Sequence, residues 1–244
     1  LDSLFVRMVG IGEAAMEEKI IDLIKGQTNP TIAPYASRGE VALRITAKST
    51  SEADNRDLIE QALELVQERL GRHIYGYDQD NLETVIGRLL KTKKYRLGLA
   101  ESCTGGLIGH RITNVPGSSD YYLGGVNSYS NRLKIGFLGV REGTLATYGA
   151  VSPETAKEMA EGVKERTGAD VGLATTGIAG PGGGSETKPV GLVYLAVALP
   201  ERTEVERRIF PFDRIGNKEA AAQAGLALLW RCLKESGQEP GVRS

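Results

Sequence analysis

The spacing of hydrophobic and polar residues changes about one third of the way along the chain. In the first part, residues 40–48 (EVALRITAK) alternate apolar and polar side chains, which indicates a strand buried on one face. Residues 29–39, with two prolines, are predicted as a loop. Further elements are predicted as strands over 5–11 and 73–77 and as helices over 13–24 and about 51–70. Together they predict a small α+β domain over residues 1–78.

In the second part, apolar strands alternate with amphipathic helices. Residues 171–177 (VGLATTG) and 190–198 (VGLVYLAVA) are almost continuously apolar, as strands covered on both faces are. The other elements are predicted as strands over 95–100 and 124–130 and as helices over 81–94, 105–115, 131–140, 151–168 and 217–236. This alternation predicts the fold class α/β, with a three-layer domain over residues 79–244.

Composition and cysteine content indicate the cellular compartment in which the protein is expected. The 244 residues, 41% hydrophobic and 25% charged, are typical of a soluble globular protein with room for two domains. No apolar run approaches the ~18 residues that a membrane span needs, and no signal peptide is recognised at the start. The two cysteines, Cys103 and Cys232, lack metal-like spacing. We therefore expect a reduced, cytoplasmic protein without a membrane partner.

Charge argues against a nucleic-acid partner. The formal net charge is −1, and residues 1–78 hold 9 Lys and Arg against 13 Asp and Glu, which gives 9 − 13 = −4. Binding to a phosphate backbone requires a basic face. The first domain also has no Gly-x-x-Gly loop of the kind that RNA-binding KH domains use. We interpret it as a structural or dimer-building domain.

The segment AESCTGG (100–106) concentrates reactive side chains where a strand meets a helix. Ser102 is expected at the carboxyl end of the strand, the edge at which α/β sheets bind ligands. Free N–H groups at the helix start can stabilise an oxyanion or hold a phosphate. Alternatively, Ser102 and Thr104 only cap the helix, or Cys103 is the nucleophile.

A serine nucleophile needs a base, and histidine is scarce. His73 belongs to the other predicted domain, and His110 lies roughly 9–12 Å along the helix from Ser102 at 1.5 Å per residue. Lysine replaces histidine in some hydrolases when its pKa is lowered. NSYSNRLK (127–134) offers Lys134, with Tyr129 five residues before it, although most lysines are simply solvated.

Two further segments have the character of binding sites. In LATTGIAGPGGGSETKPVG (173–191), Thr176 and the N–H of Gly177 are placed to face the same cleft as Ser102, unless the glycines only form a surface loop. It is not a P-loop, because no Gly-Lys-Ser/Thr follows at the required spacing. Arg214 precedes the last helix and is positioned to bind an anion, or to pair with Asp213.

Several segments, in order, resemble the C-terminal domain of the CinA family, the nicotinamide mononucleotide deamidases also called PncC. The segments that carry the resemblance are AESCTGG, GVNSYSNRLK (125–134), GAVSPETAKEMA (149–160), TTGIAGPGGGSETKPVG (175–191) and FDR (212–214). The first domain resembles the KH-type domain of full-length CinA proteins. Those proteins begin with a further domain of the metal-dependent pyrophosphatase type, which this sequence lacks, so that activity is not expected here.

The resemblance implies an amidase that converts nicotinamide mononucleotide to nicotinate mononucleotide and ammonia without a cofactor or metal. It implies Ser102 as nucleophile, Lys134 as base and Tyr129 as a hydroxyl partner in the same network. It implies that Arg214 lies near the substrate phosphate. The other residues expected to contact substrate are Cys103, Thr104, Gly105, Thr176 and Gly177. Family analogy suggests a homodimer, and the rival hypothesis is a non-catalytic nucleotide- or partner-binding module linked to competence or DNA damage.

Overall fold

The structure is a computed structural model that describes residues 1–37 and 39–236. The chain divides into two compact units, Leu1–Leu82 and Glu83–Ser244. The sequence predicted this division four residues earlier, after residue 78. Each unit is built around its own sheet, one of four strands and one of five.

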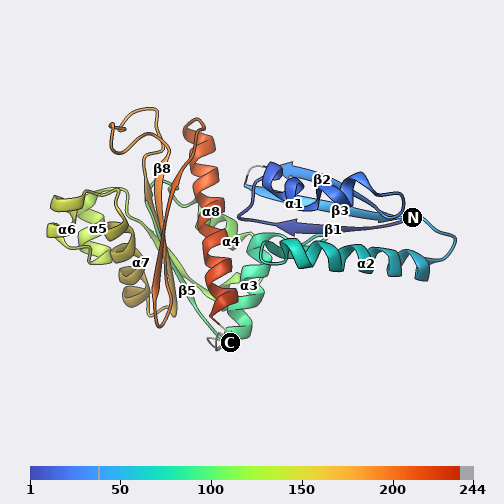
Figure 1. Cartoon of the computed structure of the whole chain (residues 1–244). Helices are drawn as coiled ribbons and strands as arrows, with labels where there is room; N and C mark the ends of the chain where they lie inside the picture. The colour runs from blue at the N-terminus through green and yellow to red at the C-terminus, as the bar shows by residue number, and fades with distance from the viewer. Residues whose placement is uncertain (38, 237–244) are drawn as a thin grey trace, which may run out of the picture. The chain divides into compact units, whose positions relative to one another are not determined.

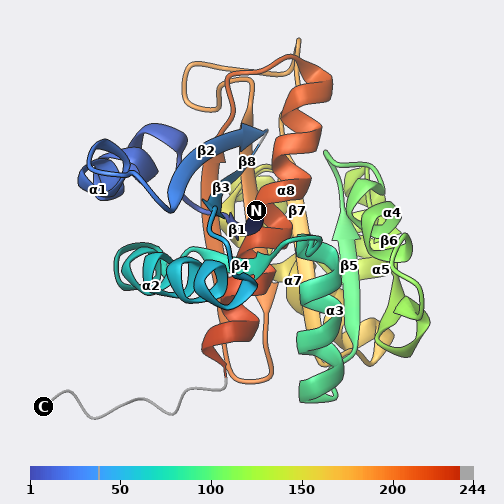
Figure 2. The ribbon, with the colours of Figure 1, turned by 90° about the vertical axis from the view of Figure 1, so that its right-hand side faces the viewer.

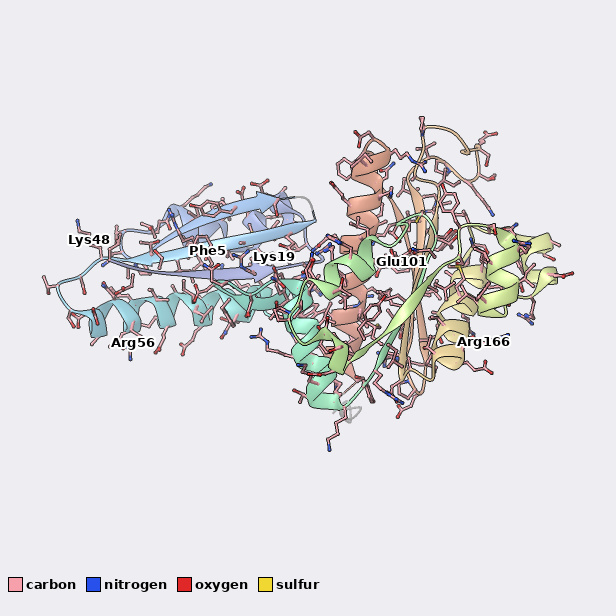
Figure 3. The ribbon with its side chains drawn as sticks, turned by 180° about the vertical axis from the view of Figure 1, so that it is seen from behind. Phe5, Lys19, Lys48, Arg56, Glu101 and Arg166 are labelled. Carbon is pink, nitrogen blue, oxygen red and sulfur yellow. The ribbon has the colours of Figure 1, made fainter. Side chains whose placement is uncertain are left out.

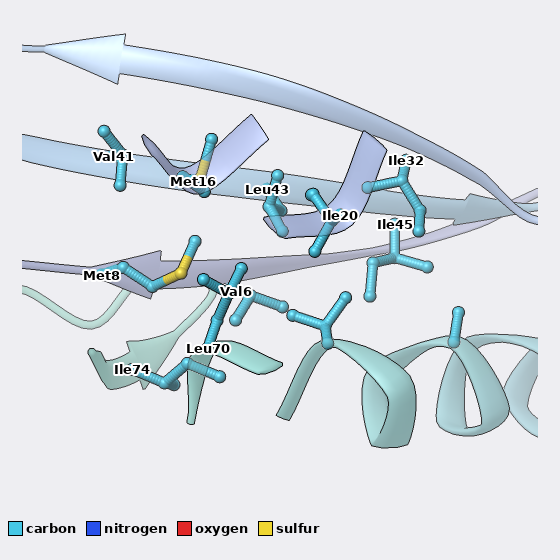
Figure 4. Packing of buried hydrophobic residues seen from close by; sticks show 12 residues of the cluster. Val6, Met8, Met16, Ile20, Ile32, Val41, Leu43, Ile45, Leu70 and Ile74 are labelled. Atoms are coloured by element: carbon cyan, nitrogen blue, oxygen red, sulfur yellow. The ribbon is translucent and has the colours of Figure 1, made fainter. Parts of the chain in front are cut away.

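The first unit is an antiparallel sheet with two helices packed on it. Its strands follow the order β2-β3-β1-β4, and α1 packs on β2 while α2 packs on β1 and β3. The elements are β1 (Asp2–Met8), α1 (Glu13–Lys25), β2 (Thr31–Ser37), β3 (Glu40–Ala47), α2 (Glu52–Leu70) and β4 (Ile74–Tyr77). Alternate strand residues such as Val6, Leu43 and Ile45 form the core with Met16 and Leu70 from the helices (Figure 4).

The prediction of a loop over residues 29–39 was wrong, because Thr31–Ser37 form β2. This strand lies at the edge of the sheet and pairs with β3 alone, with Pro34 opposite Leu43. Proline is tolerated at a sheet edge because no second neighbour needs its missing N–H. The two prolines therefore marked an edge strand and its start rather than a loop.

The second unit is a five-stranded mixed sheet in the order β6-β5-β7-β8-β9. β5 pairs in parallel with both β6 and β7, whereas β8 and β9 continue the sheet antiparallel. The strands are β5 (Leu97–Glu101), β6 (Tyr122–Asn127), β7 (Val171–Gly177), β8 (Leu192–Ala198) and β9 (Thr203–Ile209). No element was predicted over β9.

Helices cover both faces of this sheet, so the predicted three-layer α/β class is confirmed (Figures 1 and 2). On one face α7 packs against β5, β7 and β8, with α5 and α6 on α7; on the other, α8 covers β7 and β8 and α4 covers β5 and β6. The helices are α3 (Leu82–Lys93), α4 (Leu107–Thr113), the short 3-10 helix η1 (Ser118–Asp120), α5 (Asn131–Leu138), α6 (Glu142–Tyr148), α7 (Pro153–Thr167) and α8 (Arg214–Glu235). No helix in the described part of the chain has the length and apolar character required to cross a membrane.

Close packing of α7 explains a glycine in β7. A Cβ on Gly172 would lie 2.1 Å from the carbonyl oxygen of Ala160 in α7, which is far inside van der Waals contact. The apolar runs of β7 and β8 are buried between the two helix layers. A side chain at residue 172 would push α7 off the sheet and open this core.

The strand order creates a crevice at the carboxyl end of β5. The chain leaves β5 through α4 to reach β6 on one side, and then returns through α5, α6 and α7 to reach β7 on the other side. Parallel sheets bind ligands where consecutive connections diverge in this way. AESCTGG begins at Ala100 inside β5 and runs directly into this crevice.

Candidate functional site

A cavity of about 160 Å³ opens at the carboxyl edge of the second sheet. All the predicted site residues except Thr104 and Gly105 line it. The lining residues are Ser102, Cys103, Tyr129, Lys134, Ala150, Val151, Thr176, Gly177, Ala179 and Arg214. Segments that are up to 112 positions apart in the sequence therefore meet around one small cavity.

Ser102 and Lys134 form a hydrogen-bonded pair inside this cavity. The Lys134 Nζ lies 3.0 Å from the Ser102 Oγ and donates to the backbone oxygen of Ser128 at 2.6 Å. Lys134 is only 1% exposed, although lysine usually keeps its ammonium in water. The Ser102 N–H donates to the Thr175 oxygen at 3.0 Å, which holds the turn against β7. The alternative of a solvated lysine is therefore wrong.

The environment of Lys134 favours its neutral form. Burial lowers the pKa of Lys134 below its usual value, because a charged ammonium loses its hydration there. The ion pairs among the described residues include none with Lys134, so no carboxylate restores the charge. A neutral amine bonded to a hydroxyl can take its proton.

Cys103 lines the same cavity, but burial disfavours the reactive form of its side chain. Burial raises the pKa of the Cys103 thiol to about 12, so the thiol stays protonated at neutral pH. The reactive form of cysteine is the thiolate. Of the two candidate nucleophiles, Ser102 is the one whose side chain is hydrogen-bonded to the amine of Lys134.

Glu101 occupies the helix start at which sequence analysis expected an anion. Glu101, labelled in Figure 3, is 3% exposed. Its carboxylate accepts hydrogen bonds from three backbone N–H groups of α4 and the preceding turn. These come from Gly106 at 3.0 Å, Ile108 at 3.1 Å and Gly109 at 2.8 Å. Thr104 does not cap the helix either, because its Oγ1 bonds the Oγ1 of Thr175 at 2.7 Å.

Two backbone amides beside Ser102 remain available. The hydrogen bonds formed within residues 1–37 and 39–236 include none from the N–H of Cys103 or Thr104. Both residues lie in the tight turn that closes with the Gly105 N–H on the Ser102 oxygen at 3.2 Å. Free amides next to a nucleophile are the groups that stabilise a developing oxyanion.

Arg214 and Tyr129 form the outer part of the lining. The guanidinium of Arg214 donates to the Gly180 oxygen at 2.6 Å and to the Tyr129 hydroxyl at 3.1 Å. Asp213 instead caps α8 by accepting from the Gly216 N–H at 2.7 Å, and it forms no ion pair with Arg214 in the described structure. Tyr129 is 66% exposed. Its described hydrogen bond joins it to Arg214, whereas the resemblance implied a hydroxyl in the network of Ser102 and Lys134.

Thr176 closes the inner wall of the cavity. Its Oγ1 donates to the Ala150 oxygen at 2.6 Å and so ties the end of β7 to the segment before α7. Gly177 follows it at the end of the strand and carries no side chain into the cavity. Within the described residues, no group of three or more His, Cys, Asp or Glu side chains is arranged to hold a metal ion.

Comparison with known proteins covers both units. Residues 79–233 match the family described as CinA C-terminal domain, and residues 4–76 match the family described as Damage-inducible protein CinA KH domain. A CinA-like protein of Dictyoglomus turgidum is 50% identical over 231 residues, which are 95% of this chain and 56% of that protein. This chain therefore spans about half the length of that relative.

Two solved structures resemble this chain over nearly two thirds of its length. A CinA superfamily protein of Klebsiella pneumoniae is 34% identical, with a TM-score of 0.61 over 63% of this chain and 96% of that one. The competence/damage inducible protein CihA of Agrobacterium tumefaciens is 38% identical, with a TM-score of 0.58 over 64% of this chain and 97% of that one. With both of its units matched and its sheet arranged around the AESCTGG crevice, the chain belongs to the CinA family.

Proposed function

We propose that the second unit is an amidase that hydrolyses the carboxamide of nicotinamide mononucleotide to nicotinate mononucleotide and ammonia. The observation that carries this proposal is the buried hydrogen bond of 3.0 Å between the Lys134 Nζ and the Ser102 Oγ. Burial destabilises the charged form of a lysine. Buried lysines with a lowered pKa are typical of active sites in which the neutral amine acts as a base. The choice of substrate rests on the family resemblance.

The chemistry follows from the positions of these groups. Lys134 accepts the hydroxyl proton while the Ser102 Oγ attacks the amide carbon, and the N–H groups of Cys103 and Thr104 stabilise the oxyanion. The ammonium of Lys134 then returns the proton to the departing nitrogen, so that ammonia leaves rather than an amide ion. Water, with Lys134 again as base, hydrolyses the ester on Ser102 and releases the carboxylate.

The size of the cavity fits the reacting end of the substrate. Pockets that enclose a drug-sized ligand measure about 300–1,000 Å³, and this cavity of about 160 Å³ is smaller. We expect the carboxamide-bearing ring inside it, with the ribose and phosphate extending past the exposed Arg214 and Tyr129. The Arg214 guanidinium lies on that outer side and suits a phosphate.

The test measures ammonia release from nicotinamide mononucleotide, with mass detection of nicotinate mononucleotide. Three proteins are compared: the wild type, Ser102→Ala, and the control Ser119→Ala in the exposed segment after α4. We expect the wild type and the control to turn over equally and Ser102→Ala to lose at least about 10³-fold in kcat.

Each other outcome has a definite meaning. Turnover retained in Ser102→Ala would contradict the serine mechanism and direct attention to Cys103. Nucleotide binding without turnover in any of the proteins would favour a non-catalytic binding module, in line with the competence and damage names of the relatives.

A further inference from the structure

Lys218 is a cation close to the candidate site that sequence analysis did not consider. It lies one helical turn after Arg214 on α8 and is half-buried. Among the described residues it has no ion-pair partner, and no hydrogen bond from its ammonium is found. A half-buried ammonium has lost part of its hydration and gains when an anion approaches.

Gly105 shows where this ammonium lies. A Cβ built on Gly105 would be 3.7 Å from the Lys218 Nζ, so the cation sits directly over the backbone of the turn that carries Ser102. Gly105 is exposed and has φ +63, a conformation that glycine adopts without strain. Because residue 105 is glycine, no side chain fills the space between this backbone and the Lys218 ammonium.

Arg214 and Lys218 present their charges on one face of α8. Residues four apart on a helix have Cβ atoms about 5–6 Å apart, which is close enough for two side chains to contact one anionic group. Arg214 lines the cavity and is held by Gly180 and Tyr129, whereas Lys218 has no such partner within residues 1–37 and 39–236. Asp213, the carboxylate that directly precedes Arg214, is engaged as the α8 cap.

We propose that Lys218 binds the phosphate monoester of the mononucleotide together with Arg214, and that Lys218 makes the site select phosphorylated over unphosphorylated nucleosides. The identity of the substrate in this proposal rests on the proposed function. Arg214 gives the phosphate a fixed partner, and Lys218 adds a second positive charge between the phosphate and the Ser102 turn. The bound nucleotide then spans from the turn of the nucleophile to the first turns of α8.

The test compares two ligands that differ only in the phosphate, nicotinamide mononucleotide and nicotinamide riboside. In Lys218→Gln we expect KM for the mononucleotide to rise about 10-fold, equal to ~1.4 kcal/mol, with kcat within about two-fold of wild type. KM for the riboside is expected to stay unchanged. Lys218→Arg keeps the charge and is expected to restore most of the affinity. Lys157→Gln on α7, where Lys157 pairs with Glu161 at 4.0 Å, is the control and should match wild type.

Calorimetry separates this inference from the proposed function. Dissociation constants for both ligands are measured with the wild type, Lys218→Gln and Lys157→Gln, without any need for turnover. If the wild type binds the mononucleotide but does not hydrolyse it, the proposed function fails, and the loss of phosphate-dependent affinity in Lys218→Gln still decides the inference. Equal losses for both ligands, no loss for either, or a wild type that binds the mononucleotide no better than the riboside would each overturn it.

Discussion

Replacing Lys134 by methionine tests whether the fold holds a neutral amine at the candidate site. Methionine matches the length of the lysine stem and fills the same space without a charge. The 1% exposed amine of Lys134 donates to Ser102 and Ser128 in the wild type, and these bonds are lost in the variant. Turnover should therefore disappear, while the folded structure remains.

The magnitude comes from proton linkage. Burial lowers the pKa of Lys134 in the folded state below the value of 10.5 for a free side chain. Between that lowered pKa and pH 10.5 the unfolded chain holds a proton that the folded chain has released. The free energy of unfolding of the wild type therefore rises with pH across this window, by up to about 1.36 kcal/mol per pH unit. Below the window, both states are protonated and the burial cost is present in full.

The assay is thermal unfolding of the wild type and Lys134→Met from pH 7 to 10.5. The Cys103 thiol interacts electrostatically with Lys134, but its pKa of about 12 lies above this pH range, so the difference in Tm reports the titration of Lys134. We expect this difference to move in favour of the wild type by about 3–5 °C per pH unit inside the window, taking about 2–4 °C per kcal/mol for a domain of this size. In the wild type, kcat/KM should increase with pH and reach half of its maximum at the lowered pKa of Lys134, because kcat/KM reports the ionisation of the free enzyme. A Tm difference that stays constant with pH would refute the buried neutral amine.

Two further predictions concern the neighbours of Ser102. Because burial raises the pKa of the Cys103 thiol to about 12, Cys103→Ala should keep kcat within about five-fold of wild type, and alkylating reagents at pH 8 should leave turnover intact; rapid inactivation that tracks modification of Cys103 would contradict this. Glu101→Gln replaces a carboxylate oxygen by an N–H donor facing backbone N–H groups, so it should lower the free energy of unfolding in urea by roughly 2–4 kcal/mol. The matched change Glu142→Gln on the exposed start of α6 should change it by less than about 0.5 kcal/mol, and equal effects would show that the Glu101 bonds contribute little.

The elements of the fold were predictable wherever burial produced a recognisable pattern of apolar residues in the sequence. β7 and β8 are buried on both faces and appear as apolar runs, and α7 begins at its Ser152 cap and ends before Gly168, as its punctuation indicated. Two of the edge strands, β2 and β9, gave no such signal. β2 contains a proline, and β9 (TEVERRI) carries charged side chains along a strand that pairs on one side only. Their membership of a sheet comes from a neighbouring strand rather than from their own pattern.

The candidate site was predictable in its parts but not in its contacts. Lys134 and Leu138 are four residues apart and both buried in α5, so helical spacing did contain a signal that the lysine faces inward. Tyr129 follows β6 as expected, yet its hydroxyl accepts from Arg214, which lies 85 residues later. The approach of Lys218 to Gly105 depends on how α8 packs beside the Ser102 turn, and no local pattern records it.

The register of β5 with its two parallel neighbours explains why a serine and a lysine meet here without a histidine. Glu101 pairs with Asn127 on one side and with Thr175 on the other, so the residues that follow these three lie at the same edge of the sheet. The Ser128 N–H donates to the Glu101 oxygen at 2.8 Å, and the Ser102 N–H donates to the Thr175 oxygen. α5 starts immediately after this point and brings Lys134 back, one turn later, to the Ser128 oxygen. The register of the sheet and one turn of α5 therefore position the base. They keep the amine of Lys134 buried beside Ser102, although burial disfavours its charged form.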